Sequence, residues 1–343
     1  MSRKIKSRWK LILNIVTLVA LAITIYALRD QITESLDNLG KVNAWALLLM
    51  IPLQFLNYHS YTNQARSLFA ILGEKLRYRP MFRTMLELNF VNNVFPSGGV
   101  TGLSYFSIRM KDANVNAAKS SLVYLFRFIL VFLSFQVLLG LGLIMLAIDG
   151  KANGFVLLVG GSVATLVLVG TFVIAYVIGD KKRINSFFVA VSKGLNKIIH
   201  IIRPKHPETI NISKVKTLFN DLHEDYQVIK KDYRALRKPF FWSLMASVSE
   251  VATIYVVYIA FGAWVNPGAV ILAYAVANFA GFVSVLPGGI GIYEALMTAV
   301  LAASGVPAAI SIPVTVMYRI LNMAIQLPPG YYFYNKKLRS NES

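Results

Sequence analysis

Long apolar runs constrain this chain most strongly, because a helix needs about 20 apolar residues to cross a bilayer. The runs cover residues 11–28, 44–61, 120–148, 154–178, 239–261 and 308–334. Over 343 residues the chain is 56% hydrophobic and only 15% charged, which leaves no sizeable soluble domain. The pattern predicts an all-α polytopic membrane protein, with about six full spans in one integral-membrane domain over residues 1–343.

Two further apolar segments, residues 85–110 and 267–304, are broken near their middle. The breaking residues are Pro96, Gly98 and Gly99 in the first segment and Pro287, Gly288 and Gly289 in the second. Proline lacks a backbone N–H and glycine is costly inside a helix, so neither segment is expected to continue as one helix. Broken backbone at membrane depth persists only where protein buries it or where it lines a wet cavity. We therefore interpret both as re-entrant segments.

Basic residues determine the predicted orientation. The chain has 35 Lys and Arg against 16 Asp and Glu, a formal net charge of +19. The positive-inside bias of membrane proteins explains this excess, so no nucleic-acid partner is expected. We predict a cytoplasmic (inner) membrane location, with both termini and the basic loop at residues 180–238 on the cytoplasmic side. The loop is interpreted as helices on the inner leaflet or as a solvated linker, and a regulatory role is left open.

The order of the elements predicts two inverted repeats, residues 1–150 and residues 151–343. Each half contains two spans, then a broken segment, then a final span. Arg127 and Arg319 follow the two breaks at nearly equal spacing, which supports this alignment. The first broken segment is expected to enter from the cytoplasm and the second from outside. Broken helices that meet near the bilayer midplane are a transporter design.

Five charged residues fall inside the apolar segments: Arg127, Arg319, Glu87, Glu250 and Glu294. Each costs about 2.5–3.5 kcal/mol at the centre of a membrane helix, so these groups are not expected to face lipid. One interpretation is that they only neutralise one another, for example Arg319 with Glu294. The other is that they line a polar path with the broken backbone, whose free N–H groups favour anions such as phosphate.

On the second interpretation, the candidate substrate-binding residues are Pro96, Gly98, Gly99, Arg127, Pro287, Gly288, Gly289, Glu294 and Arg319. Arg127 and Arg319 are expected to face a shared cavity and to hold an anionic headgroup in turn, because the arginine fork binds two oxygens at once. Gln54, Asn57 and His59 are interpreted as interhelical hydrogen-bonding groups. There is no cysteine, and the four histidines show no ligand spacing, so no metal, cofactor or catalytic residue is expected.

At these residues the chain resembles a known family. The run Pro287-Gly-Gly-Ile-Gly-Ile-Tyr-Glu294, the earlier Pro96-Ser-Gly-Gly, the long basic loop and Arg319 are similar to the flippase-like membrane region of lysylphosphatidylglycerol synthases. The resemblance implies movement of a phospholipid between leaflets. It also implies that the chain is not an enzyme, because the family's aminoacyltransferase activity belongs to a separate domain that we expect to be absent. Stand-alone members of the family are associated with envelope lipids or lipid-linked sugars.

Three functions remain open from the sequence. The first is translocation of an anionic or modified phospholipid, or of a lipid-linked sugar, with membrane lipids as partners. The second is a non-transporting scaffold or binding subunit that would assemble with envelope-lipid synthesis enzymes. The third is ion-coupled transport of a small anion. A lateral opening wide enough for an acyl chain would favour the first over the third, and tight co-purification with a synthase would favour the second.

Overall fold

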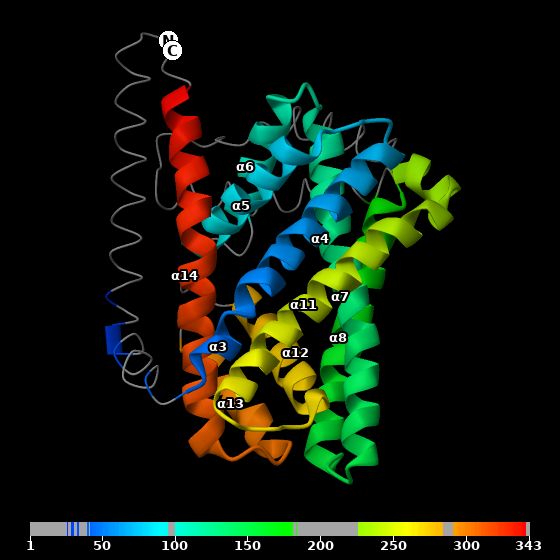
Figure 1. Cartoon of the computed structure of the whole chain (residues 1–343). Helices are drawn as coiled ribbons and strands as arrows, with labels where there is room; N and C mark the ends of the chain where they lie inside the picture. Colours follow the sequence, from blue (N-terminus) through cyan, green and yellow to red (C-terminus); the bar gives the residue numbers. More distant parts are fainter. Residues whose placement is uncertain are drawn as a thin grey trace, which may run out of the picture.

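The computed structural model describes residues 26, 29, 30, 33, 40, 42–94, 100–180, 183, 226–283 and 291–340. Within these ranges all regular secondary structure is helical. The elements, labelled as in Figure 1, are α3 (Ala44–Leu47), α4 (Met50–Ile71), α5 (Tyr78–Val94), α6 (Val100–Lys111), α7 (Ala117–Ile148), α8 (Gly154–Ile178), the 3-10 turn η1 (Tyr233–Leu236), α11 (Arg237–Ala260), α12 (Pro267–Val283), α13 (Ile292–Ala303) and α14 (Ala308–Ser340). The predicted all-α membrane fold is confirmed.

Four stretches of the described chain are long and apolar enough to cross a membrane: Ala117–Ile148, Gly154–Val173, Tyr233–Ala260 and Ala308–Lys337. They match four of the six predicted spans. The predicted span at residues 11–28 lies outside the described residues. The predicted span at residues 44–61 becomes α3 and α4, and α4 continues to Ile71. It continues because its polar side chains, such as Gln64, find buried partners on a neighbouring helix.

The centre of the molecule is the pair of helices α4 and α11, which lie side by side along their length (Figure 1). Their contact is polar and buried, and its hydrogen bonds include Gln54 Nε2 to Thr253 Oγ1 (3.2 Å), Asn57 Nδ2 to Ala246 O (2.9 Å) and Gln64 Nε2 to Ser243 Oγ (2.6 Å). The residue numbers of the partners fall along α11 as those on α4 rise, so the two helices are antiparallel. The structure thus confirms Gln54 and Asn57 as interhelical hydrogen-bonding groups, and His59 Nδ1 contacts Tyr78 Oη of α5 at 2.8 Å.

Each broken segment forms a hairpin of two short helices. Hairpin 1 joins α5 and α6, of 17 and 12 residues, and hairpin 2 joins α12 and α13, also of 17 and 12 residues. At 1.5 Å per residue, the longer arm is about 26 Å long, less than the roughly 30 Å hydrocarbon thickness. Hairpin 1 leaves and returns at the end where α4 stops and α7 starts, and hairpin 2 does so at the opposite end (Figure 1).

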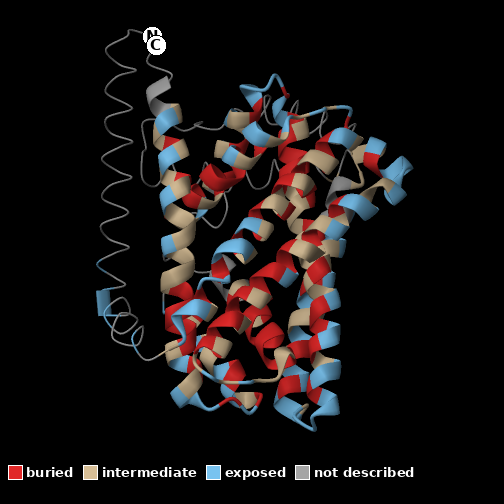
Figure 2. Cartoon of the chain, in the orientation of Figure 1, coloured by how far each residue is buried: buried red, intermediate tan, exposed pale blue. Residues whose placement is uncertain are grey.

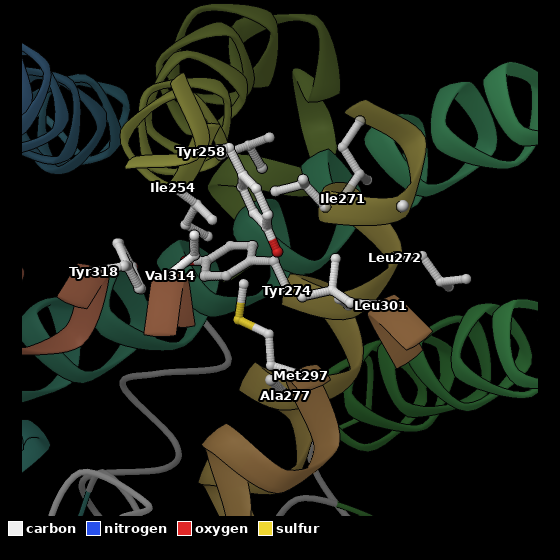
Figure 3. Packing of buried hydrophobic residues seen from close by; sticks show 14 of the residues in the cluster. Ile254, Tyr258, Ile271, Leu272, Tyr274, Ala277, Met297, Leu301, Val314 and Tyr318 are labelled. Carbon is white, nitrogen blue, oxygen red and sulfur yellow. The ribbon is translucent and has the colours of Figure 1, made fainter. Parts of the chain in front are cut away.

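Burial separates a central group of helices from a peripheral one (Figure 2). In the most apolar stretch of α11, 61% is buried inside the molecule, whereas in that of α8 only 17% is buried. The outer face of α8 exposes large apolar side chains, including Leu158 and Phe172, as expected of a surface that lipid covers. The largest cluster of buried apolar residues in the described chain includes hairpin 2, where Tyr258, Tyr274 and Met297 lie between α11, α12 and α13 (Figure 3).

Each hairpin packs against a long helix from the other half of the chain. Hairpin 1 packs through α5 against α14, and hairpin 2 packs through α12 against α7. Glycine allows the backbones of these helices to lie close together, because a side chain there would overlap the neighbouring helix. A Cβ on Gly330 would lie 2.7 Å from Leu86 O, and a Cβ on Gly268 would lie 2.2 Å from Gly142 O. On the predicted alignment α5 corresponds to α12 and α14 to α7. The equal helix lengths and exchanged contacts are compatible with inverted repeats over residues 1–150 and 151–343, which stay a prediction.

Candidate functional site

The carboxylate of hairpin 1 is neutralised within the hairpin. Glu87 of α5 accepts two hydrogen bonds from Arg109 of α6, at 2.6 Å from Nε and 3.1 Å from Nη2. Tyr105 Oη donates a third at 2.8 Å. Two parallel bonds to a guanidinium make a strong charge-assisted contact. Arg109 is not among the residues that the sequence singled out, and its pairing with Glu87 was not predicted.

The carboxylate of hairpin 2 is instead bound to the last span. Arg319 Nη1 of α14 donates to Glu294 Oε1 of α13 at 2.7 Å, with side chains 6% and 12% exposed. Glu294 also accepts the backbone N–H of Gly291 at 2.7 Å, in the first turn of α13, where a negative charge favours the helix dipole. Gly291 has φ 86°, which glycine adopts without strain. The ion pair that the sequence left as one interpretation is therefore present.

Arg127 of α7 differs from Arg319 because its described partners are an amide and aromatic rings, whereas Arg319 is bound to a carboxylate. Its Nε donates one long hydrogen bond, 3.3 Å, to Gln64 Oε1. Its guanidinium carbon lies 5.7 Å from the ring of Tyr61 and 5.8 Å from the ring of Phe106 on α6. No described carboxylate pairs with it, so four of its five N–H donors have no acceptor among the described residues. Arg127 therefore carries unused hydrogen-bonding capacity beside hairpin 1.

Glu250 of α11 is the remaining carboxylate, and it was outside the predicted binding set. It accepts hydrogen bonds from Tyr318 Oη at 2.5 Å, Asn322 Nδ2 at 3.1 Å and Gln54 Nε2 at 3.4 Å. The spacing of Tyr318, Asn322 and Gln326 along α14 places polar groups on one helix face. That spacing was the available sequence signal for this cluster.

The structure describes three of the nine predicted binding residues, and their binding role stays a prediction. Arg319 and Glu294 are brought together, and Arg127 pairs with neither of them. Arg127 lies beside hairpin 1 and Arg319 beside hairpin 2, so a cavity shared by the two arginines stays a prediction. The six residues of the breaks, Pro96, Gly98, Gly99, Pro287, Gly288 and Gly289, lie outside the described residues. Among the described residues, no group of three Asp, Glu or His side chains could hold a metal ion.

Similarity to known proteins extends over almost the entire chain. Residues 11–330 match the family described as "Lysylphosphatidylglycerol synthase TM region". A "UPF0104 membrane protein" of Methanothermobacter thermautotrophicus is 22% identical over 320 residues, which cover 91% of this chain and 90% of that protein. A "UPF0104 membrane protein" of Methanocaldococcus jannaschii is 22% identical over 341 residues, 96% of this chain and 95% of that protein. The chain belongs to the family of the lysylphosphatidylglycerol synthase transmembrane region.

Proposed function

We propose that this protein translocates a lipid with an anionic headgroup, a phospholipid or a lipid-linked sugar, between the leaflets of a membrane. Arg127 is the observation that carries the proposal. An obligate cation inside a long apolar helix is costly, and such residues mark substrate paths in membrane proteins. Arg127 is ten residues into α7, about 15 Å along the helix axis, and most of its donors have no acceptor in the part of the chain that the structure describes. A phosphate group would supply the missing acceptors and the missing negative charge.

The surroundings of Arg127 favour a headgroup over a free small anion. Aromatic rings of Tyr61 and Phe106 flank the guanidinium and keep the site half-apolar. Hairpin 1 lies on one side of this cation, and its own carboxylate is already neutralised by Arg109. A headgroup entering from the adjacent leaflet would therefore meet one open cation without a competing anion. Its acyl chains would remain in the surrounding lipid.

The two hairpins supply a route between leaflets. They approach from opposite ends of the molecule, as the broken helices of alternating-access transporters do (Figure 1). Basic side chains gather at the end where hairpin 1 starts, including those of Arg66, Lys75, Arg77, Arg79, Lys119, Lys230, Lys231, Arg237 and Lys238. By the positive-inside bias we place this end, and the C-terminus of α14, in the cytoplasm. On this proposal the protein is not an enzyme, and its partners are membrane lipids.

Reconstitution into liposomes tests the proposal. Purified protein would be mixed with a lipid that carries a fluorescent headgroup label and a phosphate, and quenching from outside would measure exchange between leaflets. We expect Arg127→Gln to lower the exchange rate at least tenfold, and Arg127→Lys to restore little of it, because lysine lacks the two-pronged fork. The matched control is Arg79→Gln, an exposed arginine at the same end of the molecule.

Two results would overturn this function. Unmodified protein that binds the labelled lipid and does not exchange it would indicate the scaffold subunit. Normal exchange in Arg127→Gln would show that the open cation does not contact the substrate.

A further inference from the structure

A buried hydrogen-bond network surrounds Glu250 at the contact of the central helices. Glu250 is 8% exposed, and its three partners come from α4 and α14. The network continues from Gln54 Oε1 to Gln326 Nε2 at 2.7 Å, and from Gln326 Oε1 to Asn89 Nδ2 at 2.8 Å. Asn89 belongs to α5, so hydrogen bonds connect this carboxylate to hairpin 1. The anion-binding role proposed for Arg127 does not use any of these groups.

Neutral groups alone contact Glu250 in the described part of the chain. Five tyrosines lie within electrostatic range of it: Tyr58 and Tyr61 of α4, Tyr274 of α12, Tyr293 of α13 and Tyr318 of α14. Of the arginines in these spans, Arg319 is bound to Glu294 and Arg127 to Gln64, and neither forms an ion pair with Glu250. A buried carboxylate without a counter-cation is costly when charged. Uptake of one cation would remove that cost.

The geometry of the partners selects a proton over a metal ion. Sodium and other hard cations are coordinated by oxygen atoms. Glu250 instead receives N–H groups from Gln54 and Asn322 and a hydroxyl from Tyr318, whose hydrogens point toward the carboxylate and would repel a metal ion. A proton needs no further ligands. When it binds to one carboxylate oxygen, Glu250 becomes neutral and gains one O–H donor.

One face of α14 connects Glu250 to both hairpins. Tyr318 and Asn322 contact Glu250, and Gln326, one turn further on, reaches Asn89 in hairpin 1. Arg319, adjacent to Tyr318, holds Glu294 in hairpin 2. A change in the hydrogen bonds at Glu250 therefore acts on the helix that contacts both moving parts. Polar chains of this kind, buried in a bundle, serve as proton relays in transporters.

We propose that Glu250 is a proton-binding site that couples lipid translocation to a proton gradient. The proposal rests on the lipid-translocating function and adds its energy source. Charged Glu250 accepts from Tyr318, Asn322 and Gln54, which holds α14 and α4 against α11. A proton binds Oε2, because Tyr318 and Asn322 already donate to Oε1 and stay bound there. The new O–H then faces the N–H of Gln54, which no longer finds an acceptor at Oε2, so the contact between α11 and α4 loosens. One proton is bound and one is released in each cycle, so charge and mass balance.

Proteoliposomes with an imposed pH difference test this coupling. The readouts are the lipid-exchange rate with and without the gradient, and lipid-dependent proton movement reported by a trapped pH dye. For the unmodified protein we expect the gradient to raise the rate at least fivefold, with proton movement that requires lipid. For Glu250→Gln the ratio of the two rates should fall to one and the proton signal should vanish. Glu74→Gln, which alters a partly exposed carboxylate paired with Lys119, is the matched control.

The outcomes separate the two proposals. Equal rates with and without the gradient in unmodified protein, or a persistent gradient effect in Glu250→Gln, overturn the proton site and leave lipid translocation standing. Absence of exchange in unmodified protein under both conditions overturns the translocating function itself.

If Glu250→Gln does not fold or shows no measurable rate, Tyr318→Phe decides the proton-site proposal. Loss of this hydroxyl removes a donor to the charged form, so the pH midpoint of gradient-free exchange should rise by about one unit. An unmoved midpoint overturns the proposal.

Discussion

Hairpin 1 and hairpin 2 have the same helix lengths and opposite orientations, but they use their carboxylates differently. In hairpin 1 the carboxylate of Glu87 is bound by Arg109 from the other arm of the same hairpin. In hairpin 2 the carboxylate of Glu294 is bound by Arg319 from the adjacent long helix. Hairpin 1 thus neutralises its own carboxylate, and its neighbour Arg127 pairs with no carboxylate among the described residues. In hairpin 2, by contrast, Glu294 pairs with Arg319, the cation of the neighbouring helix α14.

On the proposed function and the predicted repeat, this difference would mean that the two halves hold their anion sites in different states. Arg127 beside hairpin 1 would be open to a ligand, whereas Arg319 beside hairpin 2 is paired with a protein carboxylate that a headgroup would have to displace. In an inverted repeat the two halves exchange conformations during alternating access. On the proposed function, the pair between Arg319 and Glu294 would be a contact of one state, and its strength would set how readily the second site opens.

The largest effect is expected from breaking the closed site. Arg319→Gln leaves Glu294 nearly buried without its cation, which should lower the free energy of unfolding by about 3–5 kcal/mol. The double variant Arg319→Gln with Glu294→Gln removes both charges and should recover most of that loss. Thermal unfolding in detergent, followed by fluorescence, measures both. Equal destabilisation in the single and double variants would show that the ion pair does not hold hairpin 2 in place.

An intermediate effect is expected at the two equivalent glycine contacts. Gly268→Ala would bring a Cβ to 2.2 Å from Gly142 O, and Gly330→Ala would bring one to 2.7 Å from Leu86 O. Both contacts involve backbone that must shift, so each change should cost about 1–3 kcal/mol, with the greater loss at Gly268. Gly140→Ala, which meets nothing within 4 Å, is the control and should not destabilise the protein. Equal stability of all three variants would argue against close packing of the hairpins on α7 and α14.

The elements of the fold could be predicted from the sequence because they depend on local pattern. Hydropathy predicted the four spans, and proline with glycine predicted two hairpins, since these signals act within one segment. Arg127 and Arg319 were identified for a similar reason: a charge within an apolar run is visible in isolation. Polar residues inside an apolar span also predicted that Gln54 and Asn57 would form hydrogen bonds to a neighbouring helix.

The partners of the charged groups could not be predicted. Arg109 bonds Glu87 and Glu250 bonds Gln54, and such contacts depend on how each helix is rotated about its axis and how far it is shifted along its neighbour. An apolar run surrounded by lipid constrains neither quantity. The sequence therefore indicated which residues were costly in the membrane, and only the packed helices determined which of them were compensated.

The smallest effect on stability is expected at Arg127, and it sharpens the contrast with Arg319. Arg127 makes one long hydrogen bond and two ring contacts, so its removal strands no carboxylate. Glutamine at this position can keep a hydrogen bond to Gln64 and avoids the cost of a charge at this depth. The free energy of unfolding of Arg127→Gln should therefore lie within about 0.5 kcal/mol of the unmodified value. A loss comparable to that of Arg319→Gln would mean that Arg127 is bound by a structural anion outside the described residues, and the difference between the two hairpins would then disappear. An unchanged stability, combined with lower affinity for phosphate-containing lipid in a direct binding titration, would instead mean that the cation is retained for its ligand, because it contributes nothing to the fold.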